Sequence, residues 1–352
     1  MMDQLVLGEE EVSDWVRKTS VISSVRRLPG DASSRKYYRV NTQTEGEGSY
    51  IVMRMEPFSE LREQLPFLAV QRHLVAAGVD VPKVFDADPE RGFILLEDLG
   101  DVTMLRRLQA VSHEDPERYA YERVIDSLVD LQVKASPQQL PSEIEAYRLR
   151  FDREKLMWEV GFTFEHFYDL YLKRSIPDSH RKTMFEGFGE ICELLANEPT
   201  VLTHRDFHSR NVMILGDGSH HKGISPGERV VMIDFQDARM GPKQYDLASL
   251  LKDSYYQLED AQVSRLIDYY IARYEAVSGE RLDHAHFRSM FDLMHVQRNF
   301  KAIVSFASFL NKRADATYLK FIGNTFENIR RTLLRYPRYS ELRELLFHYY
   351  YF

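Results

Sequence analysis

The spacing of apolar residues changes near residue 100, and this change limits the folds that the chain can adopt. Before it, short β-type runs are separated by turn residues, and a single helix interrupts them between Pro66 and Gly78. The runs are SYIVMRM (49–55), KVFDA (83–87) and GFILLEDL (92–99). These features predict a small N-terminal lobe, residues 1–99, built from an antiparallel sheet and one helix.

After Gly100 most of the sequence has the spacing of amphipathic helices, which predicts a larger, mainly helical lobe over residues 100–352. One exception is a predicted β-hairpin that pairs residues 212–215 with residues 230–233. Helices are expected near residues 152–174, 181–197, 258–278, 284–311 and 317–335. At the other end of the chain, Val12, Trp15 and Val16 share one face of a possible capping helix within residues 1–25. The expected fold class is therefore α+β with two lobes.

Composition excludes several classes of protein. The 352 residues include 54 acidic and 46 basic side chains, a net charge of −8, which argues against a nucleic-acid coat. The single cysteine, Cys192, rules out an intrachain disulfide or a cysteine-based zinc site. The first residues are acidic, and no apolar run approaches the ~18 residues of a membrane span. We expect a cytoplasmic protein with a small-molecule substrate and without a membrane, nucleic-acid or protein partner.

The densest group of reactive side chains is the stretch HRDFHSRN (204–211), followed by MIDFQD (232–237). Phosphoryl transfer needs a carboxylate that accepts the proton of the attacking hydroxyl, and oxygen ligands that hold Mg²⁺ against the phosphates. Asp206 can be the carboxylate, Asn211 offers an amide oxygen five residues later, and Asp234 ends the second strand of the predicted hairpin. Together these three residues predict a phosphotransferase centre.

The chain resembles the aminoglycoside phosphotransferase superfamily, whose members have the two-lobed protein-kinase-like fold. The resemblance is closer to the bacterial anomeric kinases that phosphorylate N-acetylmuramate and N-acetylglucosamine in cell-wall recycling. Three segments carry it: LPGDASSRKYYRV (28–40), the catalytic stretch with IDFQDARMGPKQYDLASLL, and LMHVQRNFKAIVSFASFLNKR (293–313). The resemblance implies ATP as phosphoryl donor and Mg²⁺ as cofactor.

The resemblance also assigns roles to individual residues. It implies that Asp206 is the catalytic base, that Asn211 and Asp234 bind Mg²⁺, and that Asp246 braces the catalytic loop. The turn over the triphosphate would contain Gly30, Ser33 and Ser34, although an ordinary β-turn explains a single glycine equally well. Backbone groups of Glu97 and Leu99 would meet the adenine.

The strand that carries the phosphate-binding lysine of kinases matches YIVMR here and offers Arg54. Arginine keeps the charge and can bind phosphate through two hydrogen bonds. We therefore expect Arg54 to contact the nucleotide. A pair between Arg54 and Glu63 and a solvated strand charge both remain open.

The acceptor is expected to be a small molecule. Only 12 residues separate Asp234 from Asp246, which leaves no room for the peptide-binding activation segment of a protein kinase, and no Ala-Pro-Glu motif follows. Beside Asp206, Arg210 and Arg298 are expected to bind the acceptor, and Arg239 and Lys301 are further candidate cations. The anomeric hydroxyl is the most acidic hydroxyl of a reducing sugar, so an ordinary carboxylate can serve as its base.

The leading hypothesis is an ATP-dependent kinase that phosphorylates the anomeric hydroxyl of N-acetylmuramate or N-acetylglucosamine. One alternative is a phosphotransferase for another hydroxylated molecule, such as an aminoglycoside or a choline-like alcohol. Another is a non-catalytic nucleotide-binding protein that has kept the fold.

Overall fold

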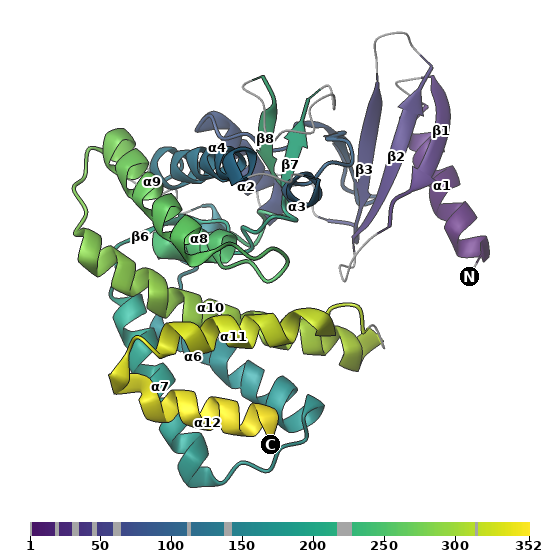
Figure 1. Ribbon diagram of the computed structural model, residues 1–352. Helices are drawn as coiled ribbons and strands as arrows, with labels where there is room; N and C mark the ends of the chain where they lie inside the picture. The colour runs from purple at the N-terminus through teal and green to yellow at the C-terminus, as the bar shows by residue number, and fades with distance from the viewer. Residues whose placement is uncertain are drawn as a thin grey trace.

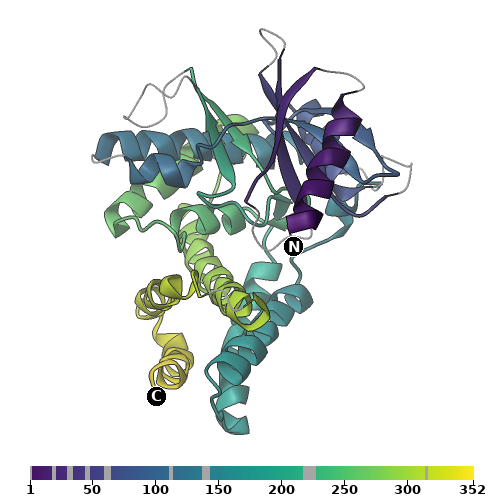
Figure 2. The same cartoon turned by 90° about the vertical axis from the view of Figure 1, so that its right-hand side faces the viewer.

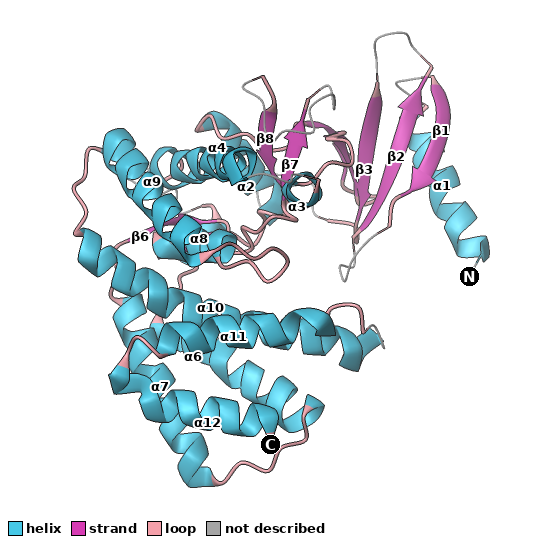
Figure 3. Ribbon diagram, viewed as in Figure 1, coloured by secondary structure: helices cyan, strands magenta, loops and turns pink. Residues whose placement is uncertain are grey.

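The structure, a computed structural model, describes residues 2–17, 21–29, 35–43, 48–58, 65–110, 114–136, 143–216, 227–313 and 316–352. It confirms the α+β class, with a five-stranded antiparallel sheet in the first hundred residues and a mainly helical remainder (Figures 1 and 3). The boundary at residue 99 stays a prediction. In the part of the chain that is described, no helix combines the length and apolarity needed to cross a bilayer.

The sheet of the N-terminal lobe has the strand order β1-β2-β3-β5-β4. Its strands are β1 (Ile22–Arg27), β2 (Lys36–Thr42), β3 (Ser49–Arg54), β4 (Val84–Asp88) and β5 (Phe93–Glu97). The predicted β-runs before and after residues 88–92 form the β4–β5 hairpin. Side chains alternate between the two faces of a strand. Ile51 and Met53 belong to the main core together with Phe67 and Leu68 of α2 (Pro66–Ala76), whereas Val52 belongs to a second cluster.

That second cluster lies under an N-terminal helix, α1 (Met2–Val16), which covers the outer face of the sheet (Figure 2). Val12, Trp15 and Val16 are all buried, as their common face predicts. The Trp15 ring lies 5.4 Å from the ring of Phe93 on β5. The N-terminal lobe therefore has two helices: α2, expected between Pro66 and Gly78, and α1, which corresponds to the possible capping helix within residues 1–25.

The C-terminal lobe is built from helices that largely follow the expected segments. They are α3 (Met104–Gln109), α4 (Glu114–Lys134), α5 (Glu145–Arg148), α6 (Arg153–Thr163), α7 (Asp178–Ala196), α8 (Gln244–Leu251), α9 (Asp260–Ser278), α10 (His284–Arg313), α11 (Ile322–Leu333) and α12 (Ser340–Tyr351). The helix expected over residues 152–174 continues beyond α6 as a π-helix, η1 (Phe164–Tyr171). Short 3₁₀ turns, η2 (Leu319–Phe321) and η3 (Pro337–Tyr339), precede α11 and α12. The sequence reasoning did not anticipate α3, α5, α8 and α12.

Two small antiparallel pairs of strands hold the motif residues. The predicted hairpin is confirmed as β7 (Val212–Leu215) paired with β8 (Arg229–Met232). A second pair, β6 (Thr200–Thr203) with β9 (Arg239–Pro242), was not expected. The segment 204–211 connects β6 to β7, and the segment 233–238 connects β8 to β9. The two pairs of strands therefore present both motif segments as loops on a rigid frame.

Several contacts between the lobes involve β8. Arg229 pairs with Glu97 at 2.7 Å and with Asp80 at 2.9 Å, both in the N-terminal lobe. The N–H group of Met232 donates to the carbonyl of Asp80 at 3.1 Å. The hairpin that precedes Asp234 is thus anchored directly to the sheet-bearing lobe.

Candidate active site

The loop that carries Asp206 is held from below by Asp246, a fully buried residue of α8. Its carboxylate accepts hydrogen bonds from the N–H groups of His204 (2.6 Å) and Arg205 (3.0 Å). These bonds hold Arg205 in the left-handed backbone region, at φ 81°, which a non-glycine residue rarely adopts. Burial raises the pKa of Asp246 to about 7, although the two N–H groups lower it. Its contacts agree with the bracing role that the resemblance implies.

A second buried carboxylate, which sequence reasoning missed, supports the other half of the loop. Asp253 accepts hydrogen bonds from the N–H group (3.0 Å) and the hydroxyl (2.5 Å) of Ser209, and its second oxygen accepts from the N–H group of Tyr255. Nothing in the local pattern LLKD distinguishes Asp253 from a surface charge. Its role depends on a contact 44 residues away in the sequence.

Asp206, Asn211 and Asp234 are brought together by a continuous set of hydrogen bonds. The Asn211 amide nitrogen donates to the carbonyl of Asp206 at 2.9 Å, so the amide oxygen is directed elsewhere. The Asn211 carbonyl in turn accepts from the N–H group of Ile233 at 3.0 Å, the residue before Asp234. The ring of His204 bonds the carbonyl of Ile233 at 2.9 Å. Burial lowers the pKa of His204, and the carboxylates of Asp234 and Asp206 oppose that shift.

The Asp206 carboxylate lies in a cationic environment. Lys301 of α10 donates to its Oδ1 atom at 3.2 Å, and the side chain of Asp206 remains 29% exposed. Burial alone would raise the pKa of Asp206. The charges of Lys301, Arg205 and Arg298 outweigh that effect, so the pKa lies well below its usual range. Asp206 is therefore a carboxylate with low basicity near neutral pH.

Asp234 and Asn211 form a donor set that fits a hard divalent cation. Asp234 is exposed and adopts a left-handed backbone conformation, φ 68°, and one of its oxygens accepts a hydrogen bond from Gln236 at 2.8 Å. The carboxylate and the amide oxygen together supply two oxygen ligands, and Mg²⁺ takes its remaining ligands from phosphates and water. Among the described residues no group of three histidine, cysteine or acidic side chains has the arrangement of a metal site.

An apolar surface lies between the segment after β5 and the β7–β8 hairpin. Leu99 packs with Met213 and Val231, and Leu215 and Ile233 flank them. The Glu97 carboxylate forms an ion pair with Arg229. The backbone N–H group of Glu97 donates to the carbonyl of Lys83 at 2.9 Å. The sequence prediction for Glu97 and Leu99 concerned their backbone groups beside a flat aromatic ligand. A small apolar surface next to Leu99 is compatible with that prediction.

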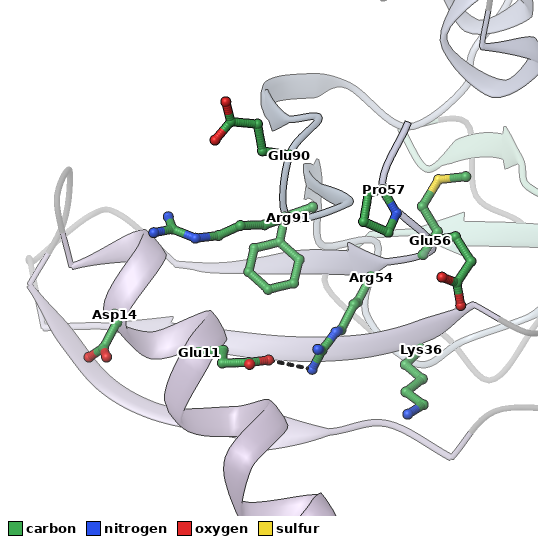
Figure 4. Close-up of a pocket in the computed structure, with 10 residues that line it drawn as sticks. Glu11, Asp14, Lys36, Arg54, Glu56, Pro57, Glu90 and Arg91 are labelled. Atoms are coloured by element: carbon green, nitrogen blue, oxygen red, sulfur yellow. Dashed lines mark ion pairs between the residues drawn. The ribbon is translucent and has the colours of Figure 1, made fainter. Parts of the chain in front are cut away.

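The expectation for Arg54 needs a correction. Its guanidinium pairs with Glu11 of α1 at 2.7 Å and lies over the ring of Phe93, on the outer face of the sheet (Figure 4). The opposite face carries Met53 and, opposite it on β2, Tyr37. Burial raises the pKa of Tyr37. The positive charge of Arg35 opposes this shift, and the negative charge of Asp234 adds to it. Asp234 therefore acts on the inner face of the sheet, which carries Tyr37.

Arg54 instead lines an open hollow of about 490 Å³ between α1 and the ends of strands β2, β3 and β5. Charged side chains of both signs line it, among them Lys36, Glu90 and Arg91 (Figure 4). Three other predicted nucleotide contacts, Gly30, Ser33 and Ser34, lie outside the described residues, as does Glu63.

The candidate acceptor residues differ in their surroundings. The Arg210 guanidinium lies between the rings of Tyr255 and Tyr318, 5.0 and 5.4 Å from their centres, and donates to the Tyr318 hydroxyl at 3.1 Å. Arg298 is only 5% exposed, and its charge lowers the pKa of Asp206. Arg239 is buried against the ring of Phe151.

Both α10 and α6 extend from the motif loops away from the sheet (Figure 2). The third expected acceptor residue, Asp206, lies next to α10. There it contacts Lys301, the fourth candidate cation.

A stacked pair of rings that sequence reasoning did not anticipate connects the N-terminal lobe to the Asp234 loop. Phe67, in the first turn of α2, lies with its ring 5.1 Å from that of Phe235, with 22° between the planes. Both residues are buried. The position of α2 is therefore coupled by packing to the residue that follows Asp234.

Comparisons with known proteins agree with this geometry. The chain is 30% identical to the N-acetylmuramate/N-acetylglucosamine kinase of Pseudomonas putida, over 96% of this chain and 93% of that protein. It is also 30% identical to the enzyme of the same name from Neisseria meningitidis, over 90% of this chain and 87% of that protein.

Solved structures show the same fold at lower identity. Choline kinase LicA from Streptococcus pneumoniae has a TM-score of 0.60 and 16% identity, over 93% of this chain and 99% of that one. The ADP-bound aminoglycoside phosphotransferase APH(2'')-Ib has a TM-score of 0.58 and 16% identity, over 95% and 98% of the two chains. The model of the phosphotransferase enzyme family matches residues 24–284, a range that includes Asp206, Asn211 and Asp234. The chain belongs to the phosphotransferase enzyme family.

Proposed function

We propose that this phosphotransferase moves the γ-phosphoryl group of ATP to the anomeric hydroxyl of an amino sugar, N-acetylmuramate or N-acetylglucosamine. The observation that carries the proposal is the hydrogen-bonded connection of Asp206, Asn211 and the Asp234 loop. The names and the identity of the curated relatives support the choice of sugar.

In this reaction Asp206 accepts the proton of the acceptor hydroxyl. The hydroxyl oxygen forms a bond to the γ-phosphorus, the bond to the bridging oxygen of ATP breaks, and ADP leaves with that electron pair. The product keeps the phosphoryl group, and Asp206 passes the proton to water. A carboxylate with a lowered pKa is a weak base, so it suits an acidic hydroxyl better than an ordinary alcohol. The anomeric hydroxyl fits this requirement.

The nucleotide would bind between the two lobes. The apolar surface of Leu99, Met213 and Val231 would support the adenine, with backbone groups of Glu97 and Leu99 at its edge. Gly30, Ser33 and Ser34 would contact the phosphates through amide and hydroxyl groups. Arg54 is not part of this proposal because its side chain lies on the other face of the sheet.

The Asn211 amide oxygen and the Asp234 carboxylate would hold Mg²⁺, which neutralises charge on the phosphates when it is bound. In a calorimetric titration, Mg²⁺ should strengthen ATP binding to the parent protein and leave ATP binding to Asp234→Ala unchanged. Asp237→Ala is the matched control, because Asp237 is also exposed in this loop but pairs with Arg205 at 3.4 Å. A full Mg²⁺ effect in Asp234→Ala would point to a different ligand set.

Arg210 and Arg298 would bind the acceptor together with Asp206. Lys301 donates to Asp206, and the charges of Lys301, Arg205 and Arg298 all lower its pKa, so cations lie close to the base. A polycationic aminoglycoside would be repelled there, whereas a neutral or acidic sugar would not. This electrostatic argument favours an amino sugar that has an N-acetyl or a carboxylate group.

The test is phosphorus NMR of the purified protein with ATP, Mg²⁺ and each sugar. We expect a sugar 1-phosphate whose signal is split by the anomeric proton. The 1-O-methyl glycoside of N-acetylglucosamine lacks the anomeric hydroxyl and serves as the control, so it should give no sugar phosphate. Absence of product with both free sugars, or equal phosphorylation of the methyl glycoside, would refute the proposal.

The shared fold with choline kinase supports a second candidate, a kinase for another small alcohol. An ATP-consumption assay over a panel of sugars, aminoglycosides and amino alcohols separates the two. A third candidate, a nucleotide-binding protein without activity, would consume ATP with none of them.

A further inference from the structure

Lys301 contacts the catalytic carboxylate from a distant part of the chain. Its ammonium group donates to Asp206 Oδ1 at 3.2 Å, across 95 residues of sequence. The Lys301 side chain is 15% exposed and that of Asp206 is 29% exposed, so this pair is partly shielded from water but open on one side. The middle of α10 therefore reaches the position where the acceptor hydroxyl must approach.

Phosphoryl transfer needs cations close to the oxygens on which charge develops. Arg54, the cation expected from the N-terminal lobe, is held by Glu11 on the far face of the sheet. Three cations lower the pKa of Asp206: Lys301, Arg205 and Arg298. Arg205 pairs with Asp237, and Arg298 is almost fully buried. Among these three, Lys301 is the one with a hydrogen bond to the carboxylate itself.

The geometry limits what the ammonium group can reach. An acceptor hydroxyl that gives its proton to Asp206 must lie about 2.6–3.2 Å from the carboxylate. An ammonium group bonded to the same carboxylate is then within reach of that hydroxyl oxygen and of the phosphoryl group in line with it. Lysine has three N–H donors, and the bond to Asp206 uses one. Two remain for the oxygens of the acceptor and the phosphoryl group.

We infer that Lys301 is a catalytic residue that donates hydrogen bonds to the acceptor oxygen and to the transferred phosphoryl group from the acceptor side. This inference rests on the proposed phosphoryl transfer and does not depend on which alcohol is the acceptor. No bond to Lys301 forms or breaks, and the ammonium group keeps its proton throughout. Its contribution is a positive charge that is fixed before the reaction begins.

A purely structural ion pair is the competing explanation, and Lys301→Met separates the two because methionine keeps the length and loses the charge. We expect kcat to fall by about 100-fold, as for the loss of one preorganised donor, while the KM for ATP changes less than threefold. A structural role predicts a lower melting temperature and an unchanged kcat in the folded fraction. A kcat within threefold of the parent would overturn the inference.

Two further variants keep the test decisive. Lys252→Met is the matched control, because Lys252 is similarly shielded and ion-paired, with Asp260 at 2.9 Å, but has no contact with Asp206 among those described. It should keep the parent's kcat. Lys301→Arg restores the charge, and we expect its kcat to be at least tenfold higher than that of Lys301→Met. If arginine restores nothing while both variants are folded, the charge is not the reason for the loss.

The failure of this inference can be told apart from the failure of the proposed function. A parent protein that forms no sugar phosphate refutes the amino-sugar assignment. Lys301 is then judged on the acceptor that the parent does use, or on slow ATP hydrolysis with water as acceptor, by the same 100-fold criterion. A Lys301→Met variant that hydrolyses ATP or phosphorylates that acceptor as fast as the parent refutes the role of Lys301.

Discussion

The loops that carry the candidate catalytic residues are connected by hydrogen bonds to backbone groups. Asn211 accepts a hydrogen bond from the N–H group of Ile233, and Asp246 accepts two from the loop before Asp206. The motif spacing singled out Asp206, Asn211 and Asp234, because phosphoryl transfer needs those oxygen atoms, and their roles stay a prediction. It could not predict the contacts of Asp253 or Lys301, because these depend on residues 44 and 95 positions away.

Arg54 shows how a single position in a strand decides a role. Because side chains alternate, a shift of one residue moves a side chain to the other face of the sheet. Met53 faces the main core, and Arg54 faces α1. The sequence offered a cation in the expected strand, but the choice between the faces depends on the register with β2 and on a helix 38 or more residues earlier.

Because Arg54 faces α1, we expect Arg54→Met to leave kcat and the KM for ATP within about threefold of the parent. Loss of this solvent-facing ion pair should cost ~1 kcal/mol or less of stability, so the variant should stay folded. Steady-state kinetics with varied ATP checks this. A rise of tenfold or more in the KM for ATP would mean that Arg54 reaches the phosphates after all, and the face assignment would be wrong.

His295, fully buried in α10, predicts a pH effect on stability. Burial, followed by the charge of Lys252, lowers the pKa of His295 to about 3 from 6.5 in an exposed histidine. Between those values the unfolded chain binds a proton that the folded chain does not, so acid favours unfolding.

In the parent, this proton should lower the free energy of unfolding by up to about 1.4 kcal/mol for each pH unit below 6.5. Replacing His295 with leucine should remove that part of the pH dependence. Urea unfolding at several pH values between 6.5 and 4 measures it. Parallel curves for the parent and His295→Leu would contradict the prediction.

At the level of helices and strands, local patterns predicted most of what formed. Period-two runs became β3, β4 and β5, and the helical segments after Gly100 became α6, α7, α9, α10 and α11. Two of the missed elements, β6 and β9, have no strong local signal. Strands β6 and β9 are four residues each and are held by a partner nearly 40 residues away. The change from α6 to the π-helix η1 follows the packing of Phe164 and Phe167 against neighbouring rings.

Helix α1 is an integral part of the N-terminal lobe. Trp15 is 8% exposed and contacts Phe93, so we expect Trp15→Ala to lower the free energy of unfolding by about 3–5 kcal/mol. The second tryptophan provides a matched control. Trp158 is 57% exposed, so Trp158→Ala should cost about 1 kcal/mol or less. Urea denaturation compares them, and equal losses would show that α1 does not cover the sheet as described.

Considered as a whole, the molecule joins its two lobes partly through residues that neighbour the Asp234 loop. Arg229 anchors the β7–β8 hairpin to Glu97 and Asp80, and the Phe67–Phe235 stack couples α2 to the loop after Asp234. A movement of the lobes on nucleotide binding would therefore shift the Asp234 loop through these packed contacts. The two-lobed architecture followed from the change in periodicity, whereas this coupling depends on side-chain contacts between lobes that no local pattern encodes.

The turnover number of Asp206→Asn, measured with saturating ATP, Mg²⁺ and N-acetylglucosamine, tests most directly whether these residues form one phosphoryl-transfer centre. Asparagine keeps the size of the side chain but cannot accept the proton, so we expect turnover to fall at least ~100-fold while the protein stays folded and binds ATP. Turnover within threefold of the parent would contradict the assignment of Asp206 as the base, and with it the proposed mechanism.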